Sequence, residues 1–225
     1  MTMRIPVVTG VMRRCGNVAT RMRMRGRAPN AASVVAEARA IRLRRAGDLV
    51  AAETWFRRAA WQREFRSADQ RRLCNEAARC AVALAETARD PVTQMEWWEA
   101  AARNVADRQL EAAVWCRLAA AKGEVARQLL AARDNPRALR QLVKGGCPSW
   151  LFGMFLKLLS QGAVTAAEHA AQARAELAVQ GLQDAFVPLP VSPDADLAAL
   201  AAECAAVSRH IALDVERTEQ LAAVA

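Results

Sequence analysis

The residues of this chain best suited to chemistry are its six cysteines and two histidines. The cysteines are Cys15, Cys74, Cys80, Cys116, Cys147 and Cys204. No two of them have the spacing of about two to four residues that is typical of paired zinc ligands. Cys74 and Cys80 are closest, but six residues place them on different faces of a helix. We therefore expect no metal site, and we expect buried thiols that act as small apolar side chains.

Neither histidine has a neighbour in sequence that would make it catalytic. His169 lies among alanines in a segment that favours a packed helix, and His210 precedes Asp214 by one helical turn, within hydrogen-bonding reach. Cys204 is six residues before His210 and points elsewhere, so it forms no nucleophile–base pair with it. The sequence also lacks a phosphate-binding loop and a dinucleotide fingerprint. We expect no catalytic residue and no cofactor.

Positive charge is concentrated in the first third of the chain. The net charge is +9, to which residues 1–28 contribute seven arginines and no acid. Residues 29–72 add ten arginines against five acids, whereas the remainder of the chain is slightly acidic. This distribution speaks against a nucleic acid that wraps the whole molecule and allows one basic end.

The basic row from Arg39 to Arg72, in which Arg63 and Arg66 also share a helix face, is the clearest functional signal in the body of the chain. Arg42 and Arg45 are three residues apart and share a helix face. Such a row is either a solvated helix surface or a patch that contacts phosphates. The candidate contacts for RNA or another anion are Arg21, Arg23, Arg25, Arg42 and Arg45. Because aromatic residues are few and expected mostly in the core, the sequence favours contact with the RNA backbone over base recognition.

Residues 1–29 read as a targeting segment or a basic arm. They are rich in arginine and free of acids, as in mitochondrial presequences, and they lack the apolar centre of a secretory signal. A basic arm that inserts into RNA, or a tail without a role, are the alternatives. No stretch reaches the roughly 18–20 apolar residues that cross a bilayer, so we expect a soluble body without a membrane span.

The remainder of the chain reads as amphipathic helices with regular start and stop signals, which makes the fold class all-α. The predicted helices cover residues 31–46, 49–65, 68–89, 91–106, 107–123, 124–132, 136–145, 148–160, 165–179 and 194–223. Short loops between them favour antiparallel hairpins. We expect a helical body over residues 30–186, a proline-rich linker over 187–193 and a C-terminal helix over 194–225.

The first predicted hairpin, over about residues 32–65, resembles the tetratricopeptide repeat family. The residues that carry the resemblance are Ala40, Leu43, Gly47, Ala52, Phe56 and Ala59. Ala36 and Glu64 stand where that family often has tryptophan and proline. Trp98 and Ala101 echo part of the pattern, and Gly123 echoes Gly47. The resemblance implies antiparallel hairpins stacked as an α-solenoid, with a role in binding or scaffolding.

Of the adjacent tryptophans Trp97 and Trp98, the repeat register predicts one in the core and the other at the surface. Trp98 falls at a core position of the repeat register, whereas Trp97 is directed about 100° away and becomes a candidate contact for a partner.

Together these features predict a non-catalytic helical-repeat scaffold in the mitochondrial matrix. Its expected partners are other protein subunits, and its basic third could contact the RNA backbone in a ribonucleoprotein such as the mitochondrial ribosome. The alternatives are a cytosolic tetratricopeptide-like adaptor that binds a protein, and an enzyme whose site is assembled only by tertiary contacts.

Overall fold

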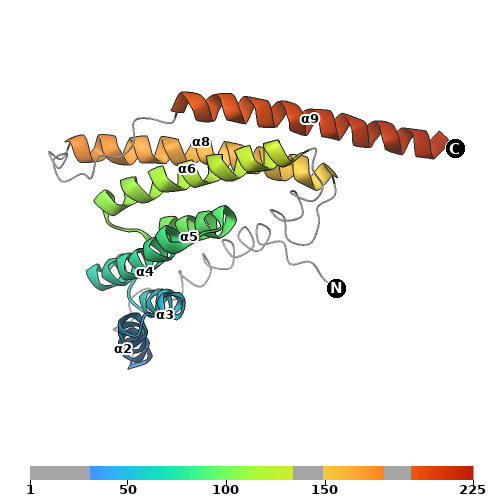
Figure 1. The fold of residues 1–225 in the computed structure, drawn as a ribbon. Helices are drawn as coiled ribbons and strands as arrows, with labels where there is room; N and C mark the ends of the chain where they lie inside the picture. Colours follow the sequence, from blue (N-terminus) through green and yellow to red (C-terminus); the bar gives the residue numbers. More distant parts are fainter. Residues whose placement is uncertain (1–30, 134–148, 180–193, 225) are drawn as a thin grey trace. The chain divides into compact units, whose positions relative to one another are not determined.

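The computed structural model describes residues 31–133, 149–179 and 194–224, which form seven α-helices and no strand (Figure 1). The helices are α2 (Ala31–Arg45), α3 (Leu49–Trp61), α4 (Ala68–Thr87), α5 (Pro91–Asn104), α6 (Arg108–Ala132), α8 (Ser149–Val179) and α9 (Asp194–Val224). The all-α class predicted from the sequence is confirmed. Residues 1–30, 134–148 and 180–193 lie outside the described residues. These ranges include the predicted targeting segment, the predicted helix after Asn135 and the predicted proline-rich linker.

The predicted start signals of α3, α4 and α5 operate as hydrogen-bonded caps. The Asp48 Oδ1 atom accepts from the backbone N–H of Ala51 at 3.1 Å. Ser67 accepts from the N–H of Gln70 at 3.1 Å, and Asp90 accepts from that of Thr93 at 2.9 Å. Each bond satisfies a backbone donor that has no partner inside the first turn of its helix.

Two left-handed residues set the turns around α3. Gly47 has a φ of 82° between α2 and α3, a conformation that glycine adopts without steric cost. Arg66 has a φ of 63° and breaks the chain direction before α4. The predicted helix over 49–65 therefore ends earlier, at Trp61, and Phe65 belongs to the connection.

Two predicted helix stops are wrong, because two glycines lie inside continuous helices. Gly123 lies within α6, and Gly162 lies within α8. A Cβ at Gly123 would come within 2.7 Å of a methyl group of Leu197 on α9. A Cβ at Gly162 would meet the Lys122 side chain of α6 at 3.0 Å. These glycines permit close helix packing, so the helices predicted over 107–123 and 124–132 are one helix, as are those over 148–160 and 165–179.

The described chain separates into two compact units. The first contains α2, α3, α4 and residues 100–107 at the end of α5. Its core is built from small residues of α2 to α4 around Phe56 and Leu73. Ser33 donates to the carbonyl of Ala59 at 3.4 Å, which places the first turn of α2 beside the last turn of α3 and makes the pair antiparallel.

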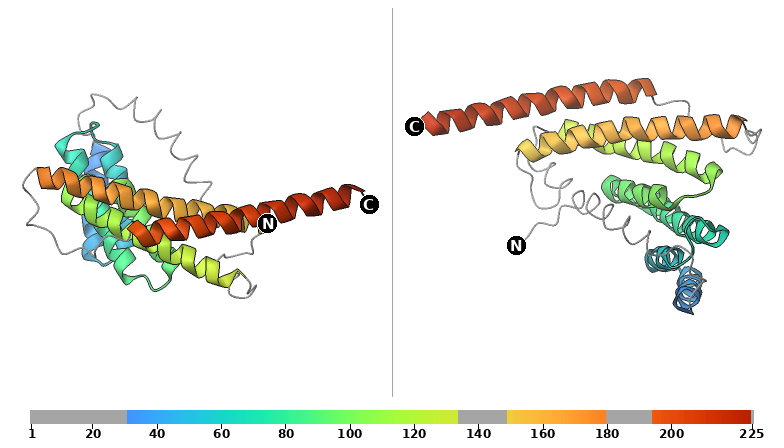
Figure 2. Two further views of the ribbon diagram at one scale, coloured as in Figure 1. Left: turned by 90° about the horizontal axis from the view of Figure 1, so that it is seen from above. Right: turned by 180° about the vertical axis from the view of Figure 1, so that it is seen from behind.

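The second unit contains residues 88–99 and 108–225. In it α8 lies alongside both α6 and α9 (Figures 1 and 2). The start of α6 meets the end of α8, because Arg108 pairs with Glu176 at 3.1 Å and Ala112 packs with Leu177. Gly153 of α8 approaches the backbone of Ser208 in α9, so these helices are also antiparallel.

Helix α9 belongs to the second unit, and the expected body over 30–186 with a separate C-terminal helix stays a prediction. Helix α9 packs on α8, where Cys204 is hydrogen-bonded with Ser160. Its buried Leu197 and Leu200 lie against Gly123 of α6. Helix α5 contributes to both units: Lys122 pairs with Glu99 at 2.9 Å in the second, whereas Asn104 belongs to the first. None of the helices within the described ranges is long and apolar enough to cross a membrane.

Candidate nucleic-acid interface on the first hairpin

The arginines of the first unit divide into two groups by whether a carboxylate lies beside them. The paired group lies where α2 and α3 meet α4. Arg44 and Arg79 pair with Glu76, and Arg57 lies 3.7 Å from Glu53. Most of these carboxylates are shielded from solvent, so the pairs join the helices and leave little net charge on this side.

Glu37 is the centre of the paired group. Its two carboxylate oxygens accept from Arg63 at 2.9 Å and from Arg72 at 2.8 Å. Arg63 is only 8% exposed, and Asp69 lies 3.6 Å from both arginines. The hydrogen bond to Glu37 raises the pKa of Arg72 above its ordinary value. These arginines are therefore held for stability and are not free to bind a ligand.

The second group comprises Arg39, Arg42, Arg45 and Arg58, which we call the cationic face. All four side chains are exposed. Within the described residues, no carboxylate forms an ion pair with any of them. On α2 they recur every three residues and so follow one side of the helix. The hairpin thus has one neutralised side and one side with unbalanced positive charge.

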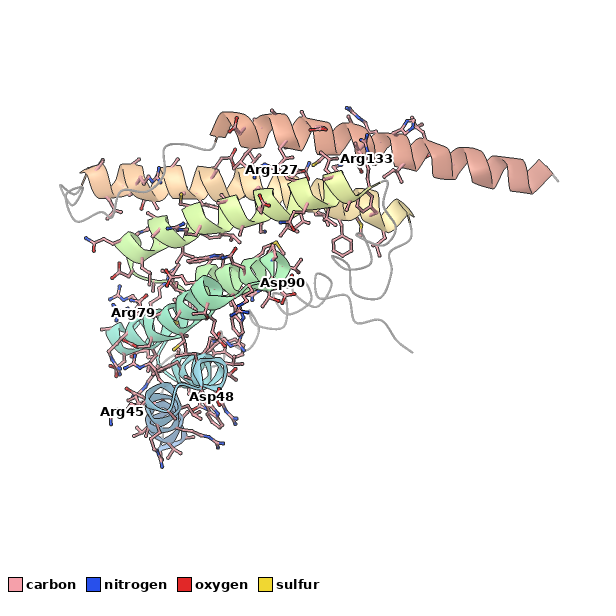
Figure 3. The ribbon with its side chains drawn as sticks, in the orientation of Figure 1. Arg45, Asp48, Arg79, Asp90, Arg127 and Arg133 are labelled. Atoms are coloured by element: carbon pink, nitrogen blue, oxygen red, sulfur yellow. The ribbon has the colours of Figure 1, made fainter. Side chains whose placement is uncertain are left out.

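Trp55 holds the cationic face together across the two helices. The guanidinium carbon of Arg39, from α2, lies 4.3 Å from the centroid of the Trp55 ring. That of Arg58, from α3, lies 5.0 Å from the same centroid. Cation–π attraction orients both guanidinium groups before any ligand arrives. Figure 3 labels Arg45, the last residue of α2, and Asp48, the cap of α3.

Two of the five arginines predicted as anion contacts therefore lie together on one surface. Arg42 and Arg45 are exposed and share the cationic face, whereas Arg21, Arg23 and Arg25 lie outside the described residues. The role of Trp55 was not predicted from the sequence. The sequence shows only that Trp55 and Arg58 are three residues apart and so share a face of one helix. The contact with Arg39 joins two helices and could be found only from the structure.

The predictions for the tryptophan pair and the cysteines can be compared with the second unit. Trp98 is buried, as predicted, and Trp97 is half-buried, which leaves its predicted partner contact as a prediction. Cys116 and Cys204 are buried free thiols, as is Cys80 in the first unit. Burial raises the pKa of the Cys80 and Cys204 thiols, which disfavours the reactive thiolate.

The histidines and acids of the described residues assemble no metal site. No group of three or more potential ligands gathers in this part of the chain. His169 is exposed, and its ring lies 4.8 Å from that of Trp115. His210 is exposed as well, and the side chain of Asp214 lies outside the described residues.

A comparison with protein-family models, curated protein sequences and solved structures found no match to this chain. The resemblance of the first hairpin to tetratricopeptide repeats therefore stays a prediction from the sequence.

Proposed function

We propose that this protein is a non-catalytic helical scaffold that holds a polyanion, the backbone of RNA, on the cationic face of its first hairpin. The single observation that carries the proposal is the separation of charge within that hairpin. Glu37 of α2 and Glu53 of α3 are engaged with the paired group and Asp48 caps α3, whereas the cationic face keeps four exposed guanidinium groups.

The chemistry of the guanidinium group favours phosphate as the ligand. Its planar fork of donors matches two phosphate oxygens at once. Two of the four arginines are already oriented on Trp55, so less side-chain entropy is lost when they bind. The seven arginines of residues 1–28 add positive charge to the same end of the sequence.

We further propose that the scaffold acts as a subunit of a mitochondrial ribonucleoprotein assembly, such as the mitochondrial ribosome. The acid-free, arginine-rich composition of residues 1–29 supports the address. Sequencing of the mature N-terminus from fractionated cells tests it: a protein purified from cytosol with Met1 intact would contradict mitochondrial import.

Salt titration of RNA binding tests the anion site. For the double variant Arg42→Gln/Arg45→Gln, the slope of log K against log salt should fall by about 1.4, since each phosphate contact on a single strand contributes about 0.7. The variant Arg103→Gln/Arg117→Gln removes the same charge from exposed positions outside the cationic face and should lower the slope by much less. Equal slopes for the two variants would contradict a localised site.

A further inference from the structure

One aromatic side chain of the first hairpin is exposed where a tryptophan is normally buried. Trp61, in the last turn of α3, is 46% exposed, although the sequence analysis expected the aromatic residues mostly in the core. Phe56 on the same helix is fully buried and fills the core of the unit. Trp61 is therefore not part of the core of the unit, and it leaves much of its large flat ring in contact with solvent.

Trp61 stands beside the cationic face. It follows Arg58 by three residues, so the two side chains are neighbours on the exposed side of α3. Arg45 lies at the turn of the hairpin, and Trp61 lies at its other end, where the bond from Ser33 to Ala59 closes the pair. Since α3 spans 13 residues, roughly 18 Å separate its two ends. On α3, Arg58 of the cationic face and the exposed ring of Trp61 thus lie about one helical turn apart.

We propose that Trp61 stacks on an unpaired nucleobase, so that the ligand of the cationic face is single-stranded RNA. The inference rests on the function proposed above and narrows its ligand class. A ligand that carries only phosphates would bind the arginines and leave Trp61 without a contact. A duplex would do the same, because its base faces are stacked inside the helix. A single strand offers both phosphates for the guanidinium groups and free base faces for the ring. An acidic peptide matches the charge but offers a flat ring only where it carries an aromatic residue, whereas every nucleotide of a single strand carries a base face.

Binding of three fluorescent probes by the full-length protein tests this inference at one salt concentration. The probes are a 12-nucleotide oligouridine, a 12-base-pair RNA duplex and inorganic polyphosphate. Trp61→Ala should weaken oligouridine binding about 5- to 150-fold, the range for loss of one base–aromatic stack, and leave polyphosphate binding unchanged. Trp61→Phe should retain part of the affinity because it keeps a ring.

Leu213→Ala is the matched control, since Leu213 on α9 is also an exposed apolar side chain and lies in the other unit. It should bind all three probes as the original chain does. Circular dichroism and the thermal midpoint check that each variant is folded, and Trp61→Phe remains informative if Trp61→Ala is destabilised.

The outcomes separate the inference from the proposed function. If Trp61→Ala binds oligouridine normally while Arg42→Gln/Arg45→Gln binds it weakly, the stacking role is overturned and the anion site stands. A preference for the duplex that is insensitive to Trp61 would also overturn the stacking role. If the original chain binds neither oligouridine nor polyphosphate at low salt, the proposed function itself fails.

Discussion

At the scale of single residues, the absence of a side chain at Gly123 is what allows α9 to approach α6. The Leu197 methyl group that a Cβ would meet is fully buried, so it has little room to move away. Glycine inside a helix costs about 1 kcal/mol relative to alanine. Its presence in the middle of a 25-residue helix therefore indicates that close packing outweighs the loss of helix propensity.

Gly123→Ala should lower the free energy of unfolding by about 1–3 kcal/mol, as is usual when a core is overpacked. Urea denaturation followed by circular dichroism measures the change. Gly162→Ala is the matched control: its Cβ would meet the flexible end of Lys122, which can shift, so the gain in helix propensity should leave that variant neutral or more stable. Equal destabilisation by both substitutions would contradict this account.

The buried thiol of Cys204 gives the stability of the protein a pH dependence. Burial raises the pKa of the folded thiol, and its hydrogen bond with Ser160 only partly opposes that effect. Because the folded pKa is the higher one, the contribution of this thiol to stability is complete below its unfolded pKa of about 8.5 and declines as the pH rises toward the folded pKa.

Cys204→Ala should therefore flatten the decline of stability between pH 8 and pH 10. Each thiol contributes at most about 1.4 kcal/mol per pH unit in the range between its unfolded and folded pKa values. Urea midpoints at several pH values would measure the slope. The same slope in both proteins would show that Cys204 titrates alike in the folded and unfolded states.

At the scale of the elements, the α2–α3 turn determines where the cationic face ends. Gly47 adopts the left-handed conformation, and Asp48 follows it at once as the cap of α3. The turn keeps α2 and α3 antiparallel, and only that arrangement brings Arg39 and Arg58 to one ring. The geometry of the candidate interface thus depends on two residues that do not belong to it.

Asp48→Ala should reduce the free energy of unfolding by about 1 kcal/mol, because the N–H of Ala51 loses its acceptor. Asp48→Asn keeps an oxygen acceptor at the same place and should stay close to the original stability. Thermal unfolding of the two variants measures the difference, and an asparagine variant as unstable as the alanine variant would assign the effect to charge instead of capping.

The elements also show how far sequence reasoning reaches. Helix starts were predictable because Asp48, Ser67 and Asp90 act on backbone groups a few residues away. Helix continuity was not, since Gly123 and Gly162 carry the same local signal as a true stop, and only a neighbouring helix distinguishes the two cases. For the candidate site the same limit holds: the arginines were visible in the sequence, but which of them Glu37 and Glu76 neutralise depends on α4.

At the scale of the whole molecule, positive charge comes from two sources, residues 1–28 and the cationic face. A variant that lacks residues 1–28 loses seven arginines but keeps the four of the cationic face. It should still bind RNA, with a salt slope of at most about 2.8, since each single-strand phosphate contact contributes about 0.7. Anisotropy titrations at several salt concentrations measure this slope. Complete loss of binding would assign the interaction to residues 1–28 alone.

The two units are interleaved along the chain, because α5 gives its first residues to one unit and its last residues to the other. Asn75 of the first unit accepts hydrogen bonds from the backbone N–H groups of Ala106 and Asp107. During synthesis these bonds can form only after residue 107 has left the ribosome. By then part of the second unit has already emerged. Likewise, the buried carboxylate of Glu53 accepts a hydrogen bond from the side-chain amide of Asn104 at 3.1 Å, and this bond cannot form until Asn104 has been synthesised. Because residues 88–99 of the second unit lie between the two segments of the first, no single cut in the polypeptide separates both units intact.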